Sequence, residues 1–135
     1  MSIQAQILNL MQDLQNEMGL TYMFITHDLS VVKHLANKIM VMYLGQVIEK
    51  APTEKLFANP VHPYTQALLS AIPRIDIDHV ELKSSPIQGE LTSPINPAPG
   101  CRFAARCPYA TEECSKGDIP LKDVGNGHMV ACLKA

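Results

Sequence analysis

The first 51 residues contain no proline, and the first 100 contain no cysteine. No lysine or arginine precedes Lys33, so the N-terminal stretch lacks the positively charged region of a secretory signal peptide. The longest apolar run is the six residues 39–44, far short of the roughly 20 that cross a bilayer as a helix. A formal net charge of −2 gives no strong field toward nucleic acid or an anionic bilayer. We therefore expect a chain that is neither secreted nor membrane-spanning and binds no nucleic acid.

The residues that are present fall into two zones. With 135 residues, 47% of them hydrophobic and 18% charged, the chain has the size and composition of one folded domain with a short appendage. All ten prolines lie at Pro52 or later and all four cysteines at Cys101 or later, whereas six of the seven methionines lie at or before Met42. This distribution predicts regular packed structure over residues 1–73, followed by a loop-rich, cysteine-containing extension over residues 74–135.

Periodicity in the first zone predicts alternating helices and strands. Apolar residues recur at helical spacing from Ile3 to Met18, and Gly19 is suited to end that helix in the left-handed conformation. Residues 20–26 form a nearly continuous apolar segment rich in β-formers, which is typical of a strand covered on both faces in a parallel sheet. Residues 39–43 have the same character. Such alternation predicts an α/β fold.

Three shorter helices are expected between and after these strands. Asp28 is placed to cap a short helix that follows the first strand. Pro52 opens a second helix that ends near Ala58, and His62 stands at the entry of a third. Over residues 74–99 the apolar periodicity is lost and prolines recur, which indicates a looped path.

His27 comes directly after the first predicted strand and just before a helix. In open α/β sheets, ligands bind at the carboxyl ends of the strands. A neutral imidazole at that edge can donate to a phosphate oxygen or accept a proton from an attacking water. From position alone, however, a histidine that merely bonds a loop carbonyl is the preferred interpretation.

A longer motif around His27 changes that interpretation. Residues 24–32, FITHDLSVV, resemble the switch-histidine segment of ABC transporter ATPases. Further segments, in the same order, are similar to the ATP-binding subunits of oligopeptide and dipeptide importers. They are MYLGQVIE, PTEKLF, NPVHPYTQALL, SPINP, GCRF and RCPYA, and then the stretch from Gly127-His128 to Cys132. The resemblance covers essentially the whole chain.

This resemblance implies a fold, a role and a set of partners. The fold would be a partial ABC-ATPase domain of the P-loop NTPase-like α/β class, with a loop-rich C-terminal cysteine extension. His27 would be catalytic, reaching the γ-phosphate and the attacking water of an intact subunit that uses ATP and Mg²⁺. The partners would be a second ATP-binding subunit and the membrane permease subunits of a peptide importer. The subunit would lie peripherally at the cytoplasmic face of the inner membrane.

Three motifs of that family do not occur in this sequence. It contains no Gly-x-x-x-x-Gly-Lys-Ser/Thr phosphate loop, no Ser-Gly-Gly-Gln-type signature, and no apolar strand that ends in Asp-Glu. In the family these motifs lie upstream of the position of Ser2, so the chain resembles a C-terminal fragment. We expect the chain alone to be inactive and not to bind ATP tightly. We also expect it to self-associate, because an unpaired apolar strand edge is a template for pairing.

Four cysteines mark the extension, with the spacing C-x5-C-x6-C-x17-C: Cys101, Cys107, Cys114 and Cys132. The spacing matches neither a C-x2-C zinc knuckle nor a bacterial ferredoxin run. Two disulfides are an alternative, but the reducing cytosol of an ATPase subunit favours thiolate–metal ligation. Four thiolates suit zinc or an iron–sulfur cluster, and ligand-free thiols stay open as well. The resemblance to peptide importers favours a [4Fe–4S] cluster over zinc.

Charged residues and histidines near the cysteines complete the candidate site. Arg102, Arg106 and Lys116 are close in sequence and can offset the negative charge of a thiolate-bound cluster. His128 is an alternative ligand, although a loop-capping role is favoured, and His62 is expected to cap a helix or face solvent. The competing functional hypothesis is a stand-alone cytosolic metal-binding module, regulatory or structural, that holds iron–sulfur or zinc.

Overall fold

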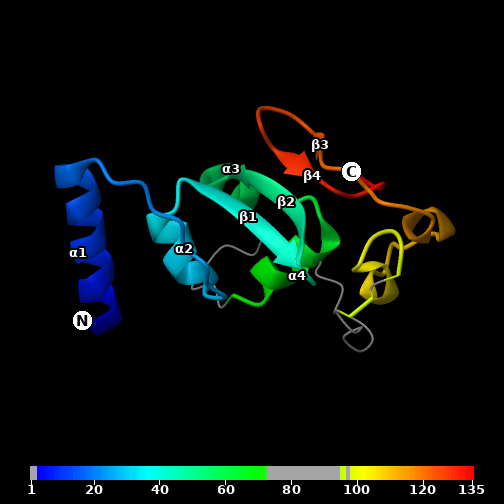
Figure 1. Cartoon of the computed structure of the whole chain (residues 1–135), viewed down its shortest axis with the longest axis horizontal. Coiled ribbons are helices and arrows are strands. Elements are labelled where there is room, and N and C mark those ends of the chain that lie inside the picture. Colours follow the sequence, from blue (N-terminus) through cyan, green and yellow to red (C-terminus); the bar gives the residue numbers. More distant parts are fainter. Residues whose placement is uncertain (1–2, 73–94, 97) are drawn as a thin grey trace, which may run out of the picture. The chain divides into compact units, whose positions relative to one another are not determined.

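The computed structural model describes residues 3–72, 95–96 and 98–135, and the chain divides into two compact units. The first unit is Met1–Ala36 and the second is Asn37–Ala135 (Figure 1). The boundary predicted between residues 73 and 74, like most of the predicted loop over residues 74–99, lies outside the described residues.

Helix α1 (Ile3–Met18) begins the first unit and confirms the helix predicted from apolar spacing. Gly19 ends it with a φ of +65°, and its N–H donates to the Gln15 carbonyl oxygen at 2.9 Å. The apolar side chains that carry the helical spacing are largely exposed, among them Ile3 at 76%. The apolar face predicted for this helix is therefore present, but few residues in the described part of this unit pack against it.

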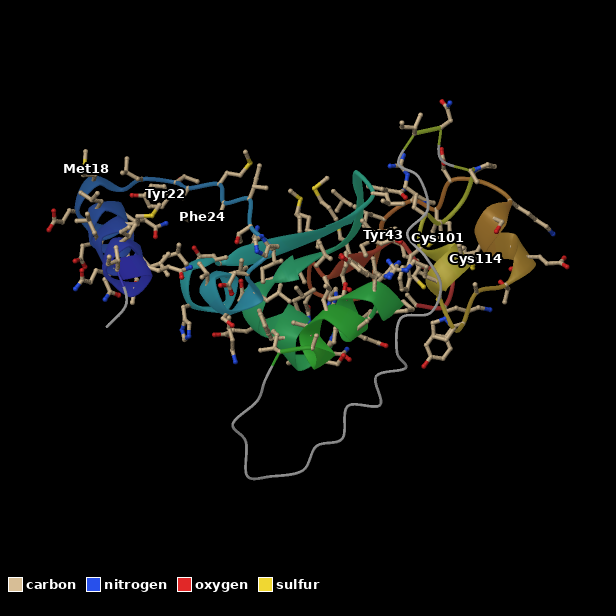
Figure 2. All side chains as sticks on the ribbon, turned by 90° about the horizontal axis from the view of Figure 1, so that it is seen from below. Met18, Tyr22, Phe24, Tyr43, Cys101 and Cys114 are labelled. Carbon is tan, nitrogen blue, oxygen red and sulfur yellow. The ribbon has the colours of Figure 1, made fainter. Side chains whose placement is uncertain are left out.

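The strand predicted over residues 20–26 is wrong, because this segment forms neither strand nor helix. Met23 is 86% exposed and Ile25 92% exposed, and the rings of Tyr22 and Phe24 lie 5.8 Å apart between centroids (Figure 2). A strand exists only when a neighbour accepts and donates its backbone hydrogen bonds, and the described residues 3–36 supply no such neighbour. The segment is apolar, as the prediction assumed, but the described residues 3–36 include no strand that could pair with it.

Helix α2 (Leu29–Leu35) follows, and its predicted cap is confirmed. The Asp28 Oδ1 atom accepts hydrogen bonds from the N–H groups of Ser30 at 3.0 Å and Val31 at 3.4 Å. These bonds satisfy two of the helix's unpaired N-terminal donors.

A four-stranded sheet organises the second unit, in the order β1-β2-β4-β3 (Figure 1). Its strands are β1 (Lys38–Tyr43), β2 (Gln46–Pro52), β3 (Lys122–Asp123) and β4 (Met129–Val130). Every pairing is antiparallel, so the predicted parallel sheet is wrong. The reason is local: only Leu44 and Gly45 join β1 to β2, whereas a parallel neighbour needs a crossover of a dozen or more residues. The coarser expectation of mixed helix and sheet is confirmed.

One face of β1 is covered and the other is open. Ile39, Val41 and Tyr43 are buried, whereas Met40 and Met42 are each 56% exposed. This alternation is typical of a strand with one face toward a core. Helix α3 (Thr53–Ala58) buries Leu56 completely, and α4 (Pro63–Ser70) buries Leu69. Both helices begin and end close to the predicted positions.

The C-terminal segment from residue 98 onward packs against the hairpin that β1 and β2 form. It contains two short 3₁₀ turns, η1 (Ala104–Arg106) and η2 (Glu112–Ser115), before β3 and β4. Phe103, 1% exposed, lies edge-on to Tyr43 of β1 at 5.2 Å and contacts Tyr64 of α4 at 5.3 Å between ring centroids. Strand β4 adds to β2 through the pairs Glu49–Val130 and Lys50–Met129. Across the described ranges, no helix has the length and apolarity that crossing a bilayer requires.

Candidate functional site

His27 lies in an exposed bend just before α2, in the first unit. The residue that follows His27 holds the backbone in place. Asp28 caps α2, and the Asp28 N–H donates a hydrogen bond to the Thr26 hydroxyl at 3.1 Å. The His27 ring makes no hydrogen bond to the described part of the chain. The imidazole is therefore presented to solvent on a capped helix start, where both nitrogens are available to a ligand.

The four cysteines lie in the second unit and line one cavity together. That cavity is bordered by Cys101, Cys107, Cys114 and Cys132, with His62 and Lys134 among its other lining residues. All four are free thiols, of which Cys114 is buried and the others are half-buried. Figure 2 shows Cys101 and Cys114 side by side near the 3₁₀ turns. The structure thus brings the predicted cysteines to one place, which their spacing along the chain could not establish.

A close backbone approach holds two of these cysteines together. The Cys101 N–H donates to the Cys114 carbonyl oxygen at 2.7 Å, and Gly100 turns the chain there with a φ of +96°. A Cβ added to Gly100 would lie 2.1 Å from that carbonyl oxygen, so the approach requires glycine on steric as well as conformational grounds.

Gly100→Ala is therefore expected to destabilise the second unit by about 2–4 kcal/mol, the sum of a strained backbone and an overpacked contact. Gly117→Ala is the matched control, because its added Cβ meets nothing within 4 Å and its φ lies outside the left-handed region. The control should change the free energy of unfolding by no more than about 1 kcal/mol. Urea unfolding of both variants checks this, and equal effects would contradict the steric argument.

Burial is the main electrostatic influence on the cavity thiols. Desolvation raises the pKa of Cys101, against a backbone hydrogen bond from Phe103 that lowers it, and the other three cysteines raise it further. Desolvation likewise raises the pKa of Cys107. Burial thus favours the neutral thiols of Cys101 and Cys107 over their thiolates, and a positive charge at the same place would oppose this effect.

The arginines do not supply that charge as expected from the sequence. The Arg102 guanidinium donates to the Leu44 carbonyl oxygen in the β1–β2 turn, and Arg106 Nη1 donates to the Tyr43 hydroxyl at 3.3 Å. Both therefore fasten the C-terminal segment to the hairpin. Lys116 is exposed, and it is Lys134 that lines the cavity.

The metal-binding geometry of the site is limited. Within residues 3–72, 95–96 and 98–135, no group of three or more His, Cys, Asp or Glu side chains is arranged to hold a metal ion. A single Zn²⁺ would need its sulfur ligands at about 2.3 Å. The hypothesis of a stand-alone metal-binding module thus finds no support in the structure.

A buried polar network that the sequence analysis missed lies beside the cavity. Glu49 of β2 is 0% exposed, and its carboxylate accepts from the N–H groups of Val61 at 2.9 Å and His62 at 3.0 Å. His128 Nε2 lies 2.5 Å from Glu49 Oε1. His128 therefore pairs with Glu49 and does not line the cavity, so its alternative role as a ligand is wrong. The available signal was that Glu49 directly follows apolar Ile48 in a segment where apolar Ala51 comes two residues later.

His62 joins the network to the cavity. Its predicted capping role is confirmed, because its Nδ1 accepts from the Tyr64 N–H at 3.1 Å at the start of α4. It does not face solvent, since only 1% of it is exposed. Burial lowers the pKa of His62 to about 4, although Glu49 opposes the shift. Its Nε2 is buried and has no hydrogen-bond partner among the described residues.

Comparison with known proteins assigns a class to this arrangement. Residues 48–114 match the family of the oligopeptide/dipeptide transporter, C-terminal region. That range contains most of β2, all of α3 and α4, and the first three cavity cysteines. This part of the chain is therefore similar to the C-terminal region of oligopeptide and dipeptide transporters.

Curated relatives match over nearly the whole chain. It is 53% identical over 132 residues to the dipeptide transport ATP-binding protein DppF of Haemophilus influenzae, covering 98% of this chain and 40% of that protein. It is 54% identical over 132 residues to DppF of Escherichia coli, covering 98% and 39%. It is 50% identical over 134 residues to the oligopeptide transport ATP-binding protein OppF of Escherichia coli, covering 98% and 40%. The chain spans about two fifths of the length of these relatives, and it corresponds to the C-terminal part of a peptide ABC transporter ATP-binding subunit.

Proposed function

We propose that this chain serves as the C-terminal part of a subunit that hydrolyses ATP to drive peptide import. The observation that carries the proposal is the identity of about half of all residues with dipeptide and oligopeptide transport ATP-binding proteins over 98% of the chain. The subunit would act at the cytoplasmic face of the membrane, with a second ATP-binding subunit and permease subunits as partners. ATP and Mg²⁺ would bind through residues outside this chain, which has no phosphate loop.

His27 is the catalytic residue in this proposal. Its exposed ring precedes the capped start of α2, so it can approach a nucleotide held by the rest of the subunit. Phosphoryl transfer depends mainly on positioning and charge stabilisation, and a histidine at the γ-phosphate orients the attacking water. Without Mg²⁺, a phosphate-loop lysine and a carboxylate, His27 alone supplies little catalysis.

A chimera tests this function directly. The matching segment of Escherichia coli DppF is replaced by this chain, and uptake of a dipeptide is measured in cells that lack their own DppF. We expect uptake within a few-fold of the native subunit, because the two sequences are 54% identical over 98% of this chain. A DppF that lacks the segment is the negative control. A stable, folded chimera that imports no more dipeptide than this control would contradict the proposal.

The cysteine cavity is proposed to hold a [4Fe–4S] cluster within that subunit. Four thiols lining one cavity match the Cys₄ donor set of such clusters, and a cluster several ångströms across does not require the close sulfur packing of one ion. His62, whose buried Nε2 has no hydrogen-bond partner among the described residues, also lines this cavity. When bound, the cluster supplies positive iron charge that stabilises the thiolates. The residues that would hold it are Cys101, Cys107, Cys114 and Cys132.

Metal and sulfide analysis tests the cluster. The chain, purified or reconstituted without oxygen, is expected to contain about four irons and about four acid-labile sulfides, with broad visible absorbance. Cys114→Ser should lose most of both, whereas Ser115→Ala, one residue away and exposed, should keep them. Zinc without sulfide, or no metal in the wild-type chain, would contradict the cluster and leave the transport proposal to the chimera test.

A further inference from the structure

The backbone on the N-terminal side of His27 is weakly held. Residues 20–26 form neither helix nor strand, and the side chains of Met23 and Ile25 are 86% and 92% exposed. Within the described part of the first unit, this segment therefore has no ladder of backbone hydrogen bonds and little packing. A catalytic group needs a defined position, because a displacement of about 1 Å can cost a large factor in rate. Any contact that orders the chain next to His27 therefore affects its chemistry.

One side-chain hydrogen bond spans His27. The Thr26 hydroxyl oxygen accepts from the Asp28 N–H at 3.1 Å, so the two residues that flank His27 are joined directly. A threonine that accepts from the backbone N–H two residues later forms a compact local turn, and His27 lies in a bend. Because threonine is branched at Cβ, its hydroxyl has few rotamers in which to turn away from this bond.

Asp28 connects this turn to helix α2. Its side chain accepts from two N–H groups in the first turn of the helix, at 3.0 and 3.4 Å. Its carbonyl oxygen accepts from the Val32 N–H at 3.3 Å. Asp28 is thus attached to α2 through both its side chain and its backbone, and the bond to the Asp28 N–H attaches Thr26 to the same helix start. His27 therefore lies between two residues that α2 anchors.

We propose that Thr26 is a positioning residue for His27, whose hydroxyl holds the backbone on the N-terminal side of the imidazole so that the ring meets the nucleotide in one orientation. This inference rests on the function proposed above, in which His27 acts at the γ-phosphate. The role of Thr26 is indirect. Its hydroxyl raises the fraction of molecules in which the ring is aligned, and the rate of hydrolysis follows that fraction.

Thr26→Val in the chimeric subunit removes the hydroxyl and keeps the size and the branched Cβ. The bond is exposed, so water can accept from the Asp28 N–H and the fold should be unaffected. We expect kcat for ATP hydrolysis to fall about tenfold, whereas KM for ATP should change by less than about twofold because ATP is held by residues outside this chain. Thr26→Ser keeps the hydroxyl and should retain most of the activity. Thr21→Val is the matched control, because Thr21 is an exposed threonine of the same segment.

A double substitution tests whether Thr26 acts through His27. Thr26→Val combined with His27→Ala should hydrolyse ATP at the rate of His27→Ala alone, because the ring to be positioned is gone. Single-turnover hydrolysis of radiolabelled ATP resolves these low rates. If the two losses multiply, Thr26 contributes independently of His27 and the proposal is overturned.

Failure of this proposal differs from failure of the proposed function. If the chimera imports dipeptide and depends on His27, but Thr26→Val hydrolyses ATP as fast as Thr21→Val, Thr26 has no positioning role and the transport function stands. A fall in the thermal unfolding midpoint of Thr26→Val that accounts for its lost activity, or an equal loss in Thr26→Ser, would also overturn the role of the hydroxyl. If the folded chimera itself neither hydrolyses ATP nor imports dipeptide, the proposed function fails and the role of Thr26 fails with it.

Discussion

Glu49→Ala is expected to lower the free energy of unfolding of the second unit by about 3–5 kcal/mol, the usual range when one member of a buried polar pair is removed. The Glu49 carboxylate is fully buried and serves three donors: two backbone N–H groups at the start of α4 and the ring of His128. Its loss leaves all three donors without an acceptor in a place that water does not reach. Each such donor costs about 1–3 kcal/mol.

Glu54→Ala is the matched control for this prediction, because Glu54 is exposed in the first turn of α3. It should change stability by no more than about 1 kcal/mol through the helix dipole. Glu49→Gln keeps one accepting oxygen and should fall between the two. Urea unfolding followed by circular dichroism measures all three, and an effect of Glu49→Ala as small as that of Glu54→Ala would show that the network contributes little to stability.

His27→Ala in the chimeric subunit is expected to reduce ATP hydrolysis and dipeptide uptake by more than about 100-fold, the lower range for loss of a general acid–base group. The fold should be unaffected, because the ring is exposed and bonds nothing in the described residues. ATPase assays of the assembled transporter and thermal unfolding of the chimera measure the two effects separately.

His34→Ala provides the comparison, since His34 is also exposed but lies at the end of α2. It should leave both hydrolysis and unfolding near the values of the unmutated chimera. If His27→Ala instead lowers the unfolding temperature while each folded molecule keeps its activity, His27 has a structural role and the catalytic assignment is wrong.

Elements that depend on local sequence were predicted well. Helix α1 follows from apolar spacing and a terminal glycine, and α2 follows from an aspartate that caps it. The short helices α3 and α4 begin where Pro52 and His62 indicated. In each case the hydrogen bonds that decide the structure join residues within four positions of each other.

Features that depend on distant partners were predicted poorly. Residues 20–26 read as a strand, but strand formation depends on a neighbour that the segment itself does not encode. The direction of the sheet depends on the two-residue turn at Leu44-Gly45, whereas the helix–strand alternation had predicted parallel strands. Glu49 and His128 are 79 positions apart, so nothing local indicated that they form a buried pair.

The candidate site shows the same division. Cysteine spacing and family resemblance identified the four thiols as a set, and the structure places them at one cavity. Arg102 and Arg106 are near the cysteines in sequence, which predicts a role beside the thiolates, yet their guanidinium groups reach the β1–β2 hairpin. Proximity in sequence indicates that the backbone of a residue lies near the site. It does not indicate where a long side chain such as that of arginine makes its contacts.

The pairing of β4 with β2 also determines when this unit can be completed during synthesis. Glu49 and Val130 are adjacent in the sheet, and the bond between the Ala131 N–H and the Ile48 carbonyl oxygen spans a similar length of chain. Closing so long a loop is entropically costly, and such non-local pairings slow folding. On the ribosome, the hairpin and α4 emerge first, with the Glu49 carboxylate still lacking its imidazole partner. The unit reaches its final stability only after His128 and β4 have been translated and released from the exit tunnel.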